Sequence, residues 1–206
     1  MAINTKFDIC SNALIQLGAE PIASFDDGTA IAQICATVYP AFKLYTLSTY
    51  PWLFTMKKQQ LARLLETPLN EYRYAFQLPT DMLTLRAMYN SGQVGAIPYI
   101  AYEIFGDGKV FTDSPKLYAD YQYEVDENKF PHYFTEFMST AFAAKIAMAV
   151  TENENLAALK KQEAFGSPSD NLSGGMFGVA KRIDSQQQSP QITPHFDLLA
   201  ARFGSW

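Results

Sequence analysis

Apolar and polar positions follow the period of an α-helix over the first 50 residues. Residues three or four apart are apolar over 5–17 and again over 30–50, which predicts two helices. Gly18 stands where a C-terminal cap is expected, and the acidic pair at 26–27 precedes the second helix, where the helix dipole favours negative charge. Pro40 removes a backbone donor within the second helix, so a kink or break is expected there.

In the next part of the chain the period changes from that of a helix to that of a strand. Polar and apolar residues alternate in several short runs, and an Asp-Gly step at 107–108 predicts a hairpin between two of them. A small antiparallel β-sheet is therefore expected between two helical segments. The predicted strands are 72–78, 84–89, 99–105, 109–112 and 118–125.

Helical spacing returns at residue 131 and continues through a second stretch at 152–165. Beyond Gly166 the residues are mostly Gly, Ser, Pro, Gln and Asn, which bury little apolar surface and predict an extended arm. The fold class predicted is therefore α+β: a helical bundle formed by N- and C-terminal helices, an inserted sheet and a C-terminal arm. The expected parts are 1–50 and 129–166 (helical), 51–128 (β-rich) and 167–206 (extended arm).

Charge and composition narrow the classes of function. The formal net charge of −5 is not the footprint of a protein that grips nucleic acid by its phosphates. Cys10 and Cys35 form neither a disulfide framework nor a metal motif, and we expect them to be reduced core residues, as in a protein assembled in a cytoplasm. The most apolar stretch, 140–150, contains Lys145 and is too short to cross a bilayer, so a soluble protein without a membrane partner is expected.

The sequence offers little chemistry. His132 and His195 lack the partner spacing of a metal site, and the glycines at 174–178 lack the preceding strand and the lysine of a phosphate-binding loop. The acidic pair at 26–27 can be read as acid–base or cation-binding carboxylates, but the following Gly28 and apolar run favour a helix start. We therefore expect no enzyme activity, catalytic residue, metal or cofactor.

Six segments in the first half of the chain carry a resemblance to a known family. They are ALIQLGAEPI (13–22), SFDDGT (24–29), CATVYP (35–40), YPWLF (50–54), QLA (60–62) and YAFQLPTDML (74–83). Their order and spacing are more specific than any one of them. On these segments, and over about residues 7–89, the chain resembles the phage tail tubular protein A family, the head-to-tail adaptors, or connectors, of short-tailed bacteriophages and their prophages.

The resemblance implies a structural virion protein in the tail or neck of the particle. It also implies a ring of twelve copies seated under the portal protein, with the C-terminal arm reaching onto the portal and a nozzle or tube protein attached below. In such a ring, genomic DNA is expected to pass through the lumen without specific binding. The alternatives are another ring or tube subunit of the same tail, and a virion-associated hydrolase acting on host polysaccharide.

The end of the arm is the candidate portal-binding site. An apolar, aromatic cluster follows a polar stretch, and exposed apolar clusters normally mark a partner site. The alternative is that this segment folds back and caps its own helical part. The residues expected to dock on the portal are Phe196, Leu199, Arg202, Phe203 and Trp206.

Overall fold

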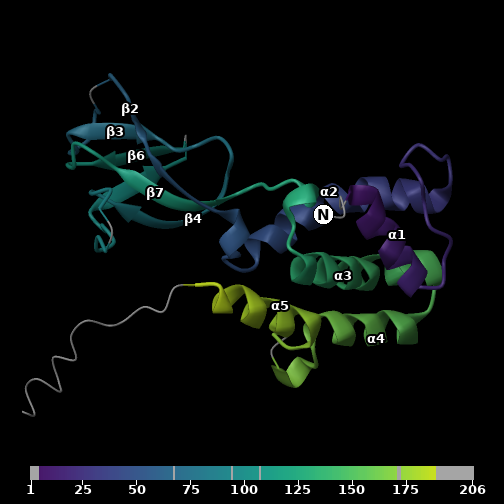
Figure 1. The fold of residues 1–206 in the computed structure, drawn as a ribbon. Coiled ribbons are helices and arrows are strands. Elements are labelled where there is room, and N and C mark those ends of the chain that lie inside the picture. The colour runs from purple at the N-terminus through teal and green to yellow at the C-terminus, as the bar shows by residue number, and fades with distance from the viewer. Residues whose placement is uncertain (1–4, 67, 94, 107, 171–172, 189–206) are drawn as a thin grey trace, which may run out of the picture.

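The computed structural model describes residues 5–66, 68–93, 95–106, 108–170 and 173–188. Within these residues the helices gather at one end of the molecule and the strands at the other (Figure 1). The predicted α+β class is confirmed. The helices are α1 (Lys6–Gln16), α2 (Ala30–Ser48), α3 (His132–Thr151), α4 (Glu154–Phe165) and α5 (Gly175–Gln186). The strands are β1 (Met56–Gln60), β2 (Ala62–Arg63), β3 (Tyr74–Gln77), β4 (Met82–Tyr89), β5 (Tyr102–Phe105), β6 (Lys109–Thr112) and β7 (Tyr118–Tyr123).

Both ends of α1 are fixed by local hydrogen bonds. Thr5 forms a capping box, in which its backbone N–H donates to Asp8 Oδ2 at 2.8 Å and its hydroxyl accepts from the Asp8 backbone N–H at 3.2 Å. At the other end Gly18 has a φ of 74°, a left-handed conformation that suits glycine. The turn lets the backbone N–H of Ala19 donate to the carbonyl of Leu14 at 3.0 Å. The predicted C-terminal cap is confirmed.

At the start of α2, Thr29 caps the helix and Asp27 holds the loop before it. Thr29 is the N-cap, because its hydroxyl accepts from the backbone N–H of Ala32 at 3.1 Å. Asp27 instead stabilises the preceding loop, where its carboxylate accepts from the backbone N–H of Ser24 at 3.0 Å. The helix is continuous across Pro40, so the proline does not break it.

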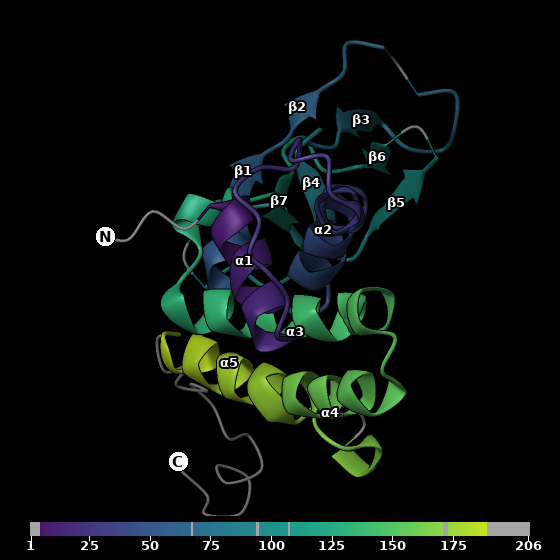
Figure 2. The ribbon, with the colours of Figure 1, turned by 90° about the vertical axis from the view of Figure 1, so that its right-hand side faces the viewer.

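The central helix is α3. Helices α1 and α2 cover one side of it, and α4 and α5 cover the other (Figure 2). It is therefore buried on most of its circumference, and its aromatic side chains form the middle of the helical core. Glu152 ends α3 in a left-handed conformation with a φ of 52°, which lets the chain turn back into α4. The largest buried side chains of α3 are Phe134, Phe137, Met138, Phe142 and Ile146.

The structure corrects the prediction of an extended arm from residue 167. Residues 175–186 form α5, which packs against α3 and α4. Phe177 places its ring 5.3 Å from that of Phe137 and 6.0 Å from that of Trp52. Gly175 allows the close approach of α5 to α4, since a Cβ there would lie 2.4 Å from the carbonyl oxygen of Glu163. The polar composition of this segment predicted no packed structure, but a few apolar residues such as Phe177 are enough to hold α5 against the helical core.

The β part contains two antiparallel sheets where one was predicted. Their strand orders are β1-β7-β4 and β2-β3-β6-β5. Strands β1 and β2 were not predicted, and they form one extended segment that passes from the first sheet to the second at Leu61. The predicted hairpin of β5 and β6 is confirmed, with Phe105 paired to Lys109 and Gly108 at a φ of 67°. A second core lies between the sheets, around Phe76, Met88, Val110 and Tyr121.

The β part is joined to the helical part at the end of α2. Gln122 on β7 is fully buried, and its side-chain amide donates to the carbonyls of Leu47 at 3.0 Å and Tyr50 at 2.7 Å. Trp52, also fully buried, donates from its indole N–H to the carbonyl of Thr46 at 3.2 Å. Because these donors lock the two parts together, the position of one sheet is set by the helical core.

Candidate interaction surfaces

The predicted portal-binding residues lie outside the part of the chain that the structure describes. That part includes nothing of 189–206, so the docking prediction stays a prediction. The residues concerned are Phe196, Leu199, Arg202, Phe203 and Trp206.

The most enclosed carboxylate of the described residues belongs to Asp184 on α5. Its Oδ1 accepts from the hydroxyl of Tyr133 at 2.6 Å, and its Oδ2 accepts from the backbone N–H of Leu53 at 3.0 Å. Burial, together with the hydrogen bond to Asp184, raises the pKa of Tyr133. The Tyr133 hydroxyl and the Leu53 N–H both donate to this carboxylate, so Asp184 ties α5 to α3 and to the segment that follows α2.

A second buried charge joins α2 to the connection between β7 and α3. The ammonium of Lys43 lies 3.1 Å from a carboxylate oxygen of Glu124 and 3.3 Å from one of Glu127. Lys43 is 7% exposed, so its charge needs these two partners. The arrangement is that of a structural ion pair at the joint.

The two cysteines lie in the helical core, as predicted, and both are free thiols. The hydrogen bond between them raises the pKa of Cys10, and burial raises it further. A thiol held protonated in a closed core is a poor nucleophile. The same hydrogen bond lowers the pKa of Cys35, but both side chains are fully buried in the helical core, so the two residues act as packing groups.

Metal-binding clusters and membrane-spanning helices are both absent from the described residues. No group of three or more His, Cys, Asp or Glu side chains in the described ranges is placed to hold a metal ion. Of the helices in those ranges, none is long and apolar enough to cross a membrane.

The helical part carries an open groove of about 740 Å³ between α2, α3 and the segment that includes α4 and the start of α5. Its walls are apolar and aromatic, and Tyr45 at its rim is 66% exposed. Two ammonium groups, those of Lys145 and Lys161, border it. A large aromatic groove of this kind on a small protein favours a protein partner.

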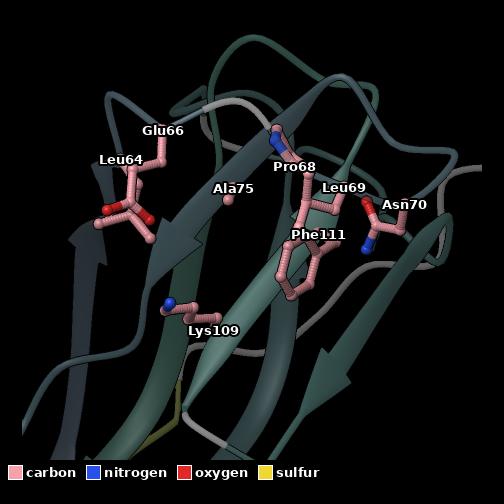
Figure 3. A pocket seen from close by; sticks show the side chains of 8 residues that line it. All are labelled: Leu64, Glu66, Pro68, Leu69, Asn70, Ala75, Lys109 and Phe111. Atoms are coloured by element: carbon pink, nitrogen blue, oxygen red, sulfur yellow. The ribbon is translucent and has the colours of Figure 1, made fainter.

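The β part carries the most exposed apolar side chains of the described chain. Leu65 and Leu69, on the β2–β3 loop, are 104% and 106% exposed, and Ile97 and Ile100, on the β4–β5 loop, are 84% and 88% exposed. Figure 3 shows Pro68 and Leu69 beside Phe111 in a hollow of about 360 Å³ on the outer face of the second sheet. Nothing in the sequence marks these residues as exposed, because Leu61, Leu64 and Leu65 recur at the spacing of a buried helical face and Ile100 lies within the strand predicted at 99–105.

No protein-family model matches the chain, and no curated protein matches it.

Proposed function

We propose that the chain is a structural subunit of a bacteriophage tail, the head-to-tail adaptor. In this proposal twelve copies form a ring between the portal protein and the tail nozzle, and genomic DNA passes through the lumen without specific binding. The protein is a component of the virion, assembled in the host cytoplasm, and no catalytic step belongs to its role.

One observation carries the proposal: three of the six segments that resemble the adaptor family contain residues with defined structural roles in the helical part. These segments supply Gly18, which caps α1, and Asp27, which holds the loop. They also supply Thr29, which caps α2, and Trp52, which is fully buried at the joint. A resemblance concentrated at positions with defined structural roles is the kind that a shared fold preserves.

The surfaces support a subunit with several protein partners. The aromatic groove lies on the helical part, and the exposed leucines and isoleucines lie on loops of the β part. Because these two apolar surfaces are on different parts of the molecule, a single copy can contact more than one neighbour at once. A ring subunit needs this property, since it has neighbours on both sides and components above and below it.

The charge supports a channel that DNA passes through. With a net charge of −5, attraction to the phosphate backbone is weak on average, so transit is not slowed by tight contacts. The docking of the ring on the portal is assigned to the last residues of the chain, which lie outside the described part. The docking residues proposed are Phe196, Leu199, Arg202, Phe203 and Trp206.

Electron microscopy of the purified chain mixed with the portal protein of the same phage tests the proposal. We expect rings of twelve copies seated on the narrow end of the portal. A matched chain that ends at residue 188 keeps every described element and should leave the portal bare. Rings that attach only to the distal tail would identify another tail subunit, and cleavage of host polysaccharide without portal binding would identify a hydrolase.

A further inference from the structure

The outer edge of β5 is the least protected strand edge of the β part. Of the other edge strands, β1 carries Lys57 and Lys58, which discourage pairing with a foreign strand, and β2 is only two residues long. On β4 the carbonyl of Met88 accepts from the backbone N–H of Tyr99 at 2.7 Å, and two register irregularities interrupt the rest of the strand. β5 ends the order β2-β3-β6-β5 and has no strand beyond it (Figure 2).

The backbone of β5 presents hydrogen-bonding groups to the open side. The carbonyl of Phe105 accepts from the backbone N–H of Gly108 at 3.1 Å, so residue 105 is turned towards the hairpin partner β6. Successive residues of an antiparallel strand alternate between the two sides. The N–H and C=O of Ile104 therefore point away from β6, where a further strand can pair with them.

The side chains on and around this edge are apolar. Ile104 is 44% exposed and Phe105 is 49% exposed, and the ring of Phe105 lies 5.2 Å from that of Phe111 in the hollow of Figure 3. The more exposed Ile97 and Ile100 precede the strand in the chain. An incoming strand would cover apolar surface as well as complete the backbone hydrogen bonds.

The charge beside the edge is negative. Partial burial raises the pKa of Tyr72, and the nearby carboxylates of Glu103, Glu71 and Asp113 raise it further. The ion pairs among the described residues involve none of these three carboxylates. The carboxylate of Glu103 therefore stands on β5 itself without an ion-pair partner among the described residues, and Glu71 and Asp113 add negative charge around Tyr72.

We infer that β5 is a docking edge for an extended, basic segment of a second protein, which adds to the sheet as a further strand. Backbone pairing at Ile104 and apolar cover over Phe105 supply the contact, and lysine or arginine side chains of the partner face Glu103 and its neighbouring carboxylates. A second copy of this chain fits less well, because a symmetric β5–β5 pairing would bring the two Glu103 carboxylates close together. The inference holds whether or not the chain is a tail adaptor.

Synthetic peptides test the edge directly in the full-length protein. The probe is a capped peptide of alternating lysine and valine, compared with one of alternating glutamate and valine and with a lysine–valine peptide whose central valine is proline. We expect the lysine–valine peptide to slow amide hydrogen exchange at Ile104. We expect binding about tenfold tighter than that of either comparison peptide.

A charge-reversal variant tests the role of these carboxylates. Glu71→Lys combined with Glu103→Lys should weaken the lysine–valine peptide about tenfold and strengthen the glutamate–valine peptide. Glu154→Lys, at the exposed start of α4, is the matched control and should change neither. The inference is overturned if both peptides bind equally, if the double variant binds like the control, or if exchange at Ile104 slows with protein concentration alone.

Discussion

Asp184 connects three segments that are far apart in the sequence, since its partners are Leu53 and Tyr133. This contact could not be predicted from the sequence, because Asp184 stands in a mostly polar run and its partner Leu53 is 131 positions away. Gly18 and Thr29, in contrast, act on residues within five positions, and their capping roles could be predicted. Contacts between residues close in the sequence can be predicted from local patterns, whereas a contact across more than a hundred positions cannot.

We expect Asp184→Ala to lower the free energy of unfolding by about 2–4 kcal/mol, because it leaves the Tyr133 hydroxyl and the Leu53 N–H buried without an acceptor. Urea denaturation measures the change. Asp26→Ala removes an exposed carboxylate and should shift stability by less than about 0.5 kcal/mol. Equal effects of the two substitutions would mean that Asp184 does not tie α5 to the joint.

The raised pKa of Tyr133 predicts a pH effect. A tyrosine whose folded pKa lies above its unfolded value of about 10 keeps its proton in the folded state while the unfolded chain loses it. Stability is therefore unaffected below about pH 10 and falls as the pH rises above it, by up to about 1.4 kcal/mol per pH unit for one such group. Tyr133→Phe should reduce the slope of unfolding free energy between pH 10 and the folded pKa, whereas Tyr45→Phe, at an exposed site, should not.

Strongly patterned elements were predictable and weakly patterned ones were not. The ranges of α1, α2, α3 and the β5–β6 hairpin follow from apolar period and turn residues. β1 has the sequence MKKQQ, and four of its five residues are exposed, so its pairing with β7 is invisible to an alternation argument. α5 was missed because tertiary packing, not composition, stabilises it.

Phe177 is the main apolar anchor of α5, in contact with Trp52, Phe137 and Phe165. We expect Phe177→Ala to cost about 2 kcal/mol or more and to speed amide exchange throughout α5 before the rest of the helical part opens. Val179→Ala, on the more exposed side of the same helix, is the control. Uniform exchange in α5 and α3 in the variant would contradict a separately anchored α5.

On the scale of the whole molecule, the hydrogen bonds of Gln122 to the end of α2 mean that the β part cannot be removed without affecting the helical part. The sequence predicted residues 51–128 as a β-rich part inserted between helical segments, but β7 supplies Gln122 to the end of α2, and Val125, just after β7, belongs to the helical core. A deletion of that length would therefore damage the helical part. The docking residues proposed between 196 and 206 lie outside the described residues, so their role rests on the sequence alone.

The free chain is expected to be a monomer or a mixture of small species, with the ring completed only on the portal. The net charge of −5 per copy opposes close association at low salt, so a template is needed to bring copies together. Sedimentation velocity of the purified chain checks this. A stable ring of twelve copies in the absence of portal protein would contradict it.

Trp206→Ala and Phe203→Ala distinguish docking from folding back. Under the proposed function each should weaken portal binding by about 2 kcal/mol, since buried aromatic anchors carry much of the affinity of an interface. The melting temperature of the free chain should not change. Lower melting temperature with undiminished portal affinity would instead place these residues on the helical part of their own chain.

The position of α3 late in the chain has a consequence for synthesis on the ribosome. α1 and α2 are finished by Ser48, but the helix that covers their apolar faces ends at Thr151. At typical translation speeds the N-terminal helices wait roughly 5 to 20 s for that partner. β1 waits for a shorter time, because its partner β7 is complete at Tyr123, so the β part can pair before α3 has been synthesised. The apolar faces of the N-terminal helices are thus the surfaces that stay open longest to chaperones and to aggregation.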